Sequence, residues 1–247
     1  MRNPYRTQNI AFFFLLLATL LIVVPVGLIV VIIIQKGLPA INWQFLTDIP
    51  RQGMRAGGIF PAIVGTLYLV TGAVAFALPI GLLAAIYLSE YSKDTIINRI
   101  IRLAIVNLSG VPSVVYGLFG LALFVVFFKF GASILSGALT LGIMILPVII
   151  TTSREALESV PQSFREVSLS LGASKWQTIR HIVLPNAIPG ILTGTILGLG
   201  RAAGETAPIL FTVAAFYLPQ LPKSVFDQAM ALPYHLYVIS TQVPNVD

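Results

Sequence analysis

Three long stretches of this sequence contain no charged side chain. Residues 56–89, 103–128 and 130–153 hold no Asp, Glu, Lys or Arg, and about 20 apolar residues are enough for a helix to cross a bilayer. Only 10% of all residues are charged, against about 25% in ordinary globular proteins. A soluble domain is therefore excluded. Because a helix satisfies its own backbone hydrogen bonds in lipid, we predict an all-α, polytopic membrane protein.

The apolar runs divide the chain into five predicted spans. The first run follows a basic start, as in a secretory signal peptide, but it far exceeds the roughly 7–15 apolar residues of such a signal, so we expect a retained helix. Arg2 and Arg6 then hold residues 1–9 in the cytoplasm. Residues 10–217 form the transmembrane domain, and residues 218–247 form an extracytoplasmic tail without a sixth span. The spans are predicted at residues 10–34, 59–88, 103–128, 137–151 and 188–217.

The basic residues are scattered between these spans and form no single patch. Nine of the 15 lie on the predicted inner side and five on the outer side, with Arg201 inside a span. The preference of basic residues for the cytoplasmic side explains the net charge of +6 better than nucleic-acid binding does. We expect no nucleic-acid partner. The chain has no cysteine, and we predict no metal site.

The third predicted span opens with small and polar residues. Lipid-facing helices have no use for so many hydrogen-bonding groups, so these residues face either a neighbouring helix or a wet cavity. The sequence leaves both alternatives open. In the second case, Ser113 and Tyr116 line a substrate pathway. The residues concerned are Asn107, Ser109, Gly110, Pro112, Ser113, Tyr116 and Gly117.

Residues 154–185 are too polar to insert into lipid and are predicted to hold two short cytoplasmic helices. Pro161 suits the first turn of the first helix, and Gly172 suits the left-handed residue that ends it. Ser174 and Gln177 match a capping box for the second helix, which we expect Pro185 to end. By pattern alone, this pair is an amphipathic connector at the lipid surface.

The fifth predicted span carries two charges in otherwise uncharged sequence. Gly190, Gly194 and Gly198 recur every four residues, a stripe of small residues that lets membrane helices approach closely. At about 100° per residue, Arg201 and Glu205 project onto the same stripe. The two charges are therefore expected to face protein and not lipid.

Two interpretations of this charged pair remain. It either neutralises itself and holds helices together, or it forms a substrate site. We favour the second, because a charge near the bilayer centre costs at least about 2.5–3.5 kcal/mol. Arginine holds an oxyanion through two hydrogen bonds and stays protonated, and Thr206 adds a hydroxyl to the candidate pathway.

The cytoplasmic helix pair resembles the EAA loop of ABC-importer permeases. The match lies in the spacing of Glu166, Gly172 and the Ile182-x-Leu184-Pro185 ending, while Val167 and Ser168 replace the two usual alanines. The resemblance implies a MetI-like fold and a loop that docks into a separate ATPase subunit, so this chain is not expected to be an enzyme. It has no phosphate-cradling G-x-x-x-x-G-K-[ST] loop of its own. The implied coupling residues are Glu166, Gly172, Ala173, Trp176, Leu184 and Pro185.

Four further segments resemble phosphate-specific ABC permeases, the last two those of the PstA type. They are residues 201–208 (RAAGETAP), 110–120 (GVPSVVYGLFG), 57–67 (GGIFPAIVGTL) and 86–91 (IYLSEY). The resemblance implies a cytoplasmic (inner) membrane importer with a sister permease, two ATPase copies and an extracytoplasmic phosphate-binding protein. ATP and Mg are then bound by the ATPase, and no cofactor by this chain. Such permeases normally have a sixth span, which is missing here.

Other functions were weighed against phosphate import. The same kind of permease would serve another oxyanion or a polar nutrient, and a membrane scaffold or sensor subunit would transport nothing. An intramembrane enzyme would need Glu205 beside His181 or His235, but these histidines fall in the inner loop and the outer tail, and no H-E-x-x-H motif occurs.

Overall fold

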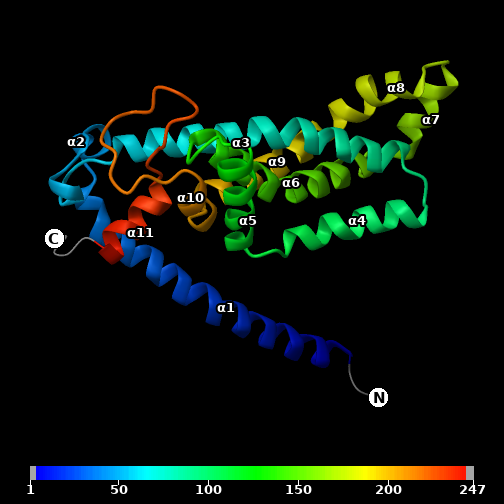
Figure 1. Cartoon of the computed structure of the whole chain (residues 1–247). Coiled ribbons are helices and arrows are strands. Elements are labelled where there is room, and N and C mark those ends of the chain that lie inside the picture. The colour runs from blue at the N-terminus through cyan, green and yellow to red at the C-terminus, as the bar shows by residue number, and fades with distance from the viewer. Residues whose placement is uncertain (1–3, 243–247) are drawn as a thin grey trace. The chain divides into compact units, whose positions relative to one another are not determined.

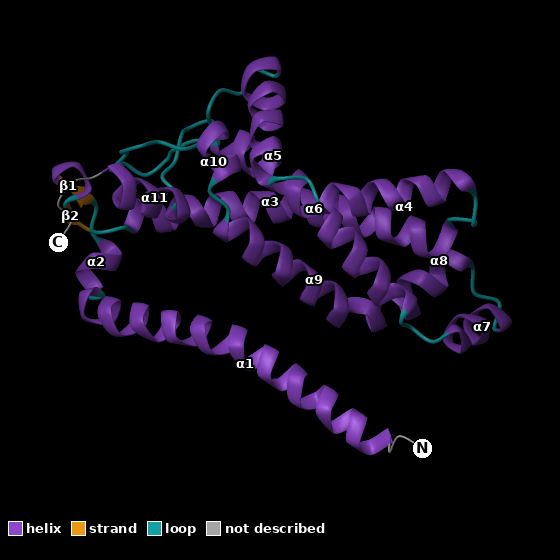
Figure 2. Cartoon of the chain, turned by 90° about the horizontal axis from the view of Figure 1, so that it is seen from below, coloured by secondary structure: helices purple, strands orange, loops and turns teal. Residues whose placement is uncertain are grey.

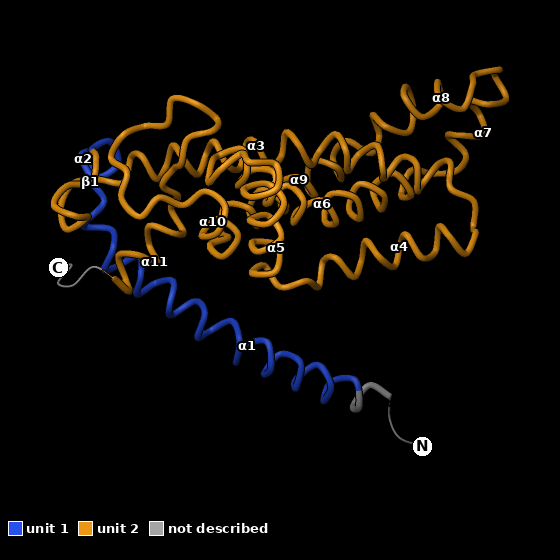
Figure 3. The backbone as a smooth tube through the Cα atoms, in the orientation of Figure 1, with its two compact units in different colours: residues 1–48 blue, residues 49–247 orange. Residues whose placement is uncertain are grey.

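The computed structural model describes residues 4–242 of the chain, almost entirely as helices (Figure 1). Arg2 and the end of the predicted tail, residues 243–247, lie outside the described residues. The chain separates into two compact units, one up to Asp48 and one from Ile49 onwards (Figure 3).

The first unit consists mainly of one long helix. Helix α1 (Pro4–Gly37) contains the predicted span at residues 10–34 and is followed by a 3₁₀ turn, Leu38–Ala40, and by the short helix α2 (Trp43–Thr47). The side chain of Asn42 caps α2 by accepting a hydrogen bond from the Phe45 amide at 2.8 Å. By length and composition, residues 8–40 are able to cross a membrane.

Three long helices form the core of the second unit: α3 (Phe60–Ile86), α6 (Ile134–Glu158) and α9 (Leu184–Gly204). All three belong to helices that are long and apolar enough to span a membrane, and α6 is the most buried of them. Leu69, Leu141, Ile145 and Ile149 are fully buried in the core. Glycines allow this close packing, because a Cβ at Gly81 would lie 2.7 Å from the Ile149 side chain.

The predicted third span at residues 103–128 is not continuous. Helix α4 (Ile96–Ser109) ends before Pro112, and α5 (Ser113–Gly120) then departs at 100° and continues as a π-helical segment, Leu121–Phe127. The break follows from local chemistry, since the residue before a proline is disfavoured in a helix and proline has no amide hydrogen to donate. Figure 1 shows α5 crossing the direction of α4.

The predicted helix end at Pro185 is wrong. Helix α7 (Gln162–Ser170) is separate, but α8 (Lys175–Thr178) runs through a π-helical segment, Ile179–Val183, directly into α9. Pro185 lies in the first turn of α9, where the missing amide hydrogen is no loss. Figure 2 shows α7 and α8 at one end of this unit and the hairpin of β1 (Pro50–Arg51) and β2 (Ala56–Gly57) at the other.

The predicted fifth span at residues 188–217 is also interrupted. Helix α9 ends at Gly204, Glu205 has extended backbone angles (φ −78°, ψ 134°), and the short helix α10 (Ala207–Thr212) follows. The chain then passes over the start of α6, where the amides of Ile134 and Leu135 donate to the carbonyls of Asp227 and Val225, both at 2.9 Å. It ends in helix α11 (Leu232–Gln242).

Candidate functional site

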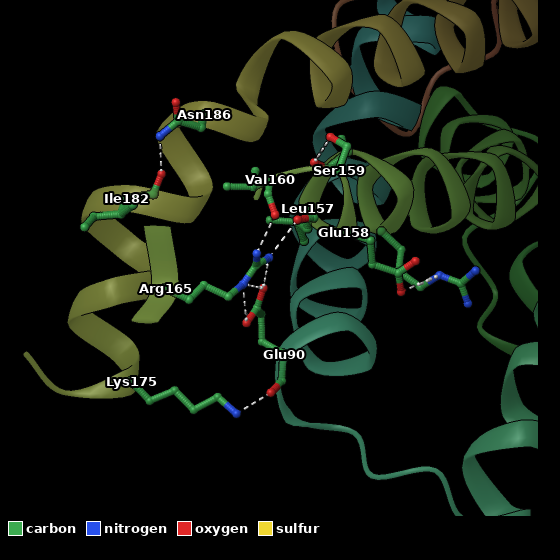
Figure 4. A network of polar contacts seen from close by, with 11 residues as sticks. Glu90, Leu157, Glu158, Ser159, Val160, Arg165, Lys175, Ile182 and Asn186 are labelled. Carbon is green, nitrogen blue, oxygen red and sulfur yellow. Dashed lines mark hydrogen bonds and ion pairs between the residues drawn. The ribbon is translucent and has the colours of Figure 1, made fainter. Parts of the chain in front are cut away.

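A buried ion pair joins the helix pair α7–α8 to the end of α3. Arg165 of α7 donates from Nη2 to Oε1 of Glu90 at 2.7 Å and from Nε to the same oxygen at 3.2 Å (Figure 4). The two side chains are only 12% and 8% exposed. The remaining donors of Arg165 reach the carbonyls of Val160, at 2.6 Å, and Leu157, at 2.8 Å. The guanidinium is thus held by one carboxylate and two backbone oxygens through all three of its nitrogens.

Two more cations surround the same end of α3, which finishes in a π-helical turn, Tyr87–Tyr91. Lys175 donates from Nζ to the backbone carbonyl of Glu90 and lies 4.8 Å from the centre of the Tyr91 ring. Arg102 of α4 places Nη2 3.4 Å from the Leu88 carbonyl and 3.4 Å from Ser92 Oγ. Cations favour the carbonyl end of a helix, so this terminus is held from three other elements.

The helix pair itself is fixed by hydrogen bonds. Ser168 and Thr178 join α7 to α8 through their hydroxyls at 2.9 Å, and both residues are buried. Ser174 and Gln177 form the predicted capping box. Between the two helices Gly172 has φ +87°, a conformation that favours glycine.

The outward side of this pair is apolar and exposed. Leu171 is 84% exposed and Val167 is 60% exposed. Exposed apolar patches of this kind are typical of surfaces that contact another protein or a membrane. Of the predicted coupling residues, Glu166, Gly172, Trp176 and Pro185 are exposed, and Ala173 and Leu184 are half-buried. The exposed large apolar side chains of the pair are Phe164, Val167, Leu169, Leu171 and Trp176.

A polar cavity of about 570 Å³ lies beneath the helix pair. It is bounded by the end of α3, the end of α6 and both short helices, and Glu90, Arg165 and Lys175 all line it. The contact between α7 and the membrane helices is therefore loosely packed, and the Glu90–Arg165 ion pair lines the cavity.

The second cluster lies where the fifth predicted span is interrupted. Nε of Arg201, in the last turn of α9, is 3.6 Å from Oε1 of Glu205, and the two side chains are 34% and 19% exposed. Thr206 lies between Glu205 and α10 and is half-buried. The predicted placement of both charges on one continuous helix is wrong, because Gly204 ends the helix and Pro208 starts the next one.

Helix α5 packs against this interruption. Gly117 permits the contact, since a Cβ there would lie 3.0 Å from the Cα of Pro208 and 2.8 Å from the Phe211 ring. Tyr116 is buried and donates its hydroxyl to the Leu108 carbonyl at 2.8 Å. The structure thus pairs Glu205 with Arg201, while Tyr116 and Ser113 lie on α5, which packs against α10.

The predicted glycine stripe of α9 lies against α6. A Cβ at Gly190 would approach that of Ala156 to 2.6 Å, and one at Gly194 would overlap the Thr152 side chain. Gly198 has ordinary space beside Ile149, at 3.5 Å. Two of the three positions therefore accept nothing larger than glycine without movement of α6.

The predicted site residues include none of Glu90, Arg165 and Lys175. Glu90 does carry a signal, because it is the first charge after the uncharged run at residues 56–89 and precedes a basic loop. Its partner Arg165 lies 75 positions further along the chain. No local pattern connects two residues at that separation.

Comparison with known proteins agrees with this architecture. Residues 77–243 match the family described as "Binding-protein-dependent transport system inner membrane component". The chain is 34% identical to the "Probable ABC transporter permease protein YqgI" of Bacillus subtilis, over 90% of this chain and 80% of that protein.

Several similar proteins are named as phosphate permeases. The "Phosphate transport system permease protein PstA" of Xylella fastidiosa is 36% identical over 81% of this chain and 69% of its own length. The "Phosphate transport system permease protein PstA 1" of Mycobacterium tuberculosis is 40% identical over 74% of this chain and 59% of its own length. This chain therefore belongs to the family of binding-protein-dependent transport system inner membrane components, and within it to the permeases of the PstA type.

Proposed function

We propose that this chain is the transmembrane subunit of an importer that moves inorganic phosphate across the cytoplasmic membrane by alternating access. In this proposal it pairs with a sister permease, two copies of an ATPase that bind ATP and Mg, and an extracytoplasmic phosphate-binding protein. The N-terminus and the α7–α8 pair lie in the cytoplasm. The names of the PstA relatives support the substrate.

The observation that carries the proposal is the Arg201–Glu205 pair at the interruption between α9 and α10. The guanidinium is held in position by a carboxylate at 3.6 Å, yet it is partly exposed and therefore accessible to an anion. An oxyanion that arrives beside it gains two parallel hydrogen bonds from the planar guanidinium. Because Glu205 competes for the same group, phosphate binding stays weak enough for release, as conduction requires.

The neighbouring groups support a polar passage at this point. The helix interruption leaves the backbone at Glu205 and Thr206 outside a regular helix, and such backbone is tolerated at membrane depth where it is packed in protein or lines a wet cavity. Tyr116, Ser113 and Thr206 supply hydroxyls on α5 and before α10. These residues form the proposed pathway together with Arg201 and Glu205.

The exposed apolar side of α7 and α8 is the proposed contact with the ATPase. Closure of the ATPase pair pulls on these helices, and the pull reaches α9 because α8 continues into it without a break. Arg201 lies in the last turn of that same helix. One rigid element therefore links the proposed ATPase contact to the proposed pathway.

Substitution of Arg201 tests this function. The chain is assembled with its native partner subunits in vesicles, and ATP-dependent uptake of labelled phosphate is measured for the wild type, Arg201→Gln and Arg99→Gln. We expect Arg201→Gln to abolish uptake with the complex still assembled. Arg99 is a matched control, since its pair with Asp94 at 3.6 Å is solvent-exposed.

Two results would contradict the proposal. Normal uptake by Arg201→Gln would leave the arginine as a packing residue. A wild-type complex that hydrolyses ATP but takes up sulfate or molybdate in preference to phosphate would assign the permease to another oxyanion.

A further inference from the structure

Helix α7 is attached to the rest of the protein by polar contacts. Its one buried residue is Ser168, whose hydroxyl meets that of Thr178. Its large apolar side chains, Phe164, Val167 and Leu169, are 44–60% exposed, and Leu169 lines the cavity beside the ion pair. Hydrophobic burial therefore contributes little to the position of α7, and directed polar contacts decide it.

The membrane helices beside α7 are, in contrast, joined by an apolar core. Ala85 and Ile86 of α3, Leu157 of α6, and Ile179 and Val183 before α9 are all buried and pack in one cluster at this end of the unit. None of the members described for this cluster comes from α7. The three membrane helices thus form one packed block to which α7 is attached separately.

We infer that the Glu90–Arg165 ion pair is the joint through which movement of α7 is passed to α3. Both residues are positioning residues for transport: neither contacts the substrate pathway, and together they fix the angle of α7 on the packed block. The inference rests on the proposed function, since it concerns how ATP-driven movement reaches the membrane helices.

The geometry of the joint fits this role better than a simple structural contact. Arg165 binds Glu90 on α3 and the Leu157 and Val160 carbonyls at the end of α6, so a single guanidinium holds α7 to two membrane helices. The cavity of about 570 Å³ beside it leaves room for α7 to tilt about this point. The π-helical turn that carries Glu90 is a geometry often found at functional sites.

Glu90 also receives Lys175 at its backbone carbonyl. Arg165 lies on α7, and Lys175 lies at the start of α8. One residue of α3 therefore contacts both helices of the pair on either side of Gly172. A tilt of α7 relative to α8 therefore changes the pull on Glu90, as the proposed transmission requires.

The test measures how much phosphate is moved for each ATP hydrolysed. Glu90→Ala, Glu90→Gln, Arg165→Ala and the double Ala variant are assembled with the native partner subunits in vesicles. Asp94→Ala is the matched control, because Asp94 follows the same helix end but pairs with Arg99 in solvent. ATP hydrolysis, phosphate uptake and retention of the ATPase are measured on each preparation.

We expect ATP hydrolysis and subunit retention to persist while transported phosphate per ATP falls by about tenfold in Glu90→Ala, the effect of losing one charged hydrogen-bonded contact. Glu90→Gln should fall between this variant and the wild type, because its amide oxygen still accepts from Arg165. The double variant should be no worse than Arg165→Ala, since Glu90 has no arginine partner left to lose once Arg165 is replaced.

Three outcomes would overturn the inference. Unchanged phosphate per ATP in Glu90→Ala shows that the pair transmits nothing. Loss of the ATPase from all the Glu90 and Arg165 variants would show that the ion pair serves only assembly of the complex. Additive effects in the double variant would show that the two residues act independently and not through their contact. A wild-type complex that hydrolyses ATP without moving phosphate would instead refute the proposed function. Failure of the proposed function is thus seen in the wild type, whereas failure of the inference is seen only in the variants.

Discussion

Arg201 and Glu205 remain paired although the helix that carries Arg201 ends between them. Nε and Oε1 are 3.6 Å apart, a separation that allows electrostatic attraction without a close hydrogen bond. The pair sits at the carboxyl end of α9, where the helix dipole favours the arginine and disfavours the glutamate. Because the two groups are separated by 3.6 Å and form no close hydrogen bond, an incoming anion can replace the glutamate more easily.

Removal of the charge at Glu205 is expected to strengthen phosphate binding and to slow turnover. In Glu205→Gln, Arg201 loses its competing anion, so the concentration for half-maximal uptake should fall and the maximal rate should fall with it. Initial uptake rates over a range of phosphate concentrations measure both quantities. Glu158→Gln, which alters the i,i+4 pair with Arg154 at 3.4 Å, is the control. A raised half-maximal concentration would mean that Glu205 assists binding.

Replacement of Gly172 is expected to weaken association with the ATPase through backbone strain. With φ at +87° and open space where a Cβ would stand, alanine costs about 1–2 kcal/mol, which corresponds to a factor of about 5–30 in an equilibrium. Gly172→Asn should cost less, because asparagine tolerates this conformation. Binding of the purified ATPase to the permease measures the effect.

Gly131→Ala provides the control for that experiment. Gly131 also has positive φ and open space, but it lies in the turn between α5 and α6 at the other side of the membrane helices. It should leave ATPase binding unchanged. Equal losses in the Gly131 and Gly172 variants would show that general destabilisation, and not the loop, is responsible.

The contact of Gly194 with Thr152 is expected to limit the stability of the helix core. Gly194→Ala forces its methyl group against the Thr152 side chain and should destabilise the chain by about 1–3 kcal/mol. Gly194→Ala with Thr152→Ala should recover only part of the loss, because the second change removes Oγ1, which overlaps the added Cβ, but keeps the Cβ of residue 152, at 2.5 Å from it. Thermal unfolding in detergent reports the differences. Gly200→Ala, with open space around it, should be neutral or stabilising; a comparable loss there would contradict the steric explanation.

His235 is expected to make stability depend on pH. It is buried in α11, outside the helices able to span a membrane, and burial lowers the pKa of its imidazole. Below about pH 6.5 the imidazole of His235 becomes protonated in the unfolded chain, whereas in the folded chain it stays neutral to a lower pH. The free energy of unfolding is therefore highest above about pH 6.5 and decreases as the pH falls below it. Each unit of pKa difference contributes about 1.4 kcal/mol.

Unfolding temperatures between pH 8 and pH 5 check this expectation. His235→Phe keeps an aromatic ring without a titrating group and should flatten the profile. The chain has one other histidine, His181, which is exposed, so His181→Phe is the control. An unchanged slope in His235→Phe would assign the pH dependence to other groups.

Local chemistry explains why parts of this protein were predictable and others were not. The long apolar runs, the capping box at Ser174 and Gln177, and the glycine turn at Gly172 each depend on residues close together in the chain, and the structure contains all of them. The breaks at Pro112 and at Gly204 also have local causes. Hydropathy alone does not reveal these two breaks, because the apolar sequence continues across both of them.

The sequence by itself determined that this is a polytopic helical permease, where its apolar runs lie, and that the fifth run contains two charges. Only the tertiary structure decided that Arg165 binds Glu90, that α5 packs against the interruption between α9 and α10, and that α6 is the most buried of the long helices. Hydropathy and capping are set by the nearest few residues. The pairing of Glu90 with a residue 75 positions away depends on how three membrane helices pack, which no local pattern records.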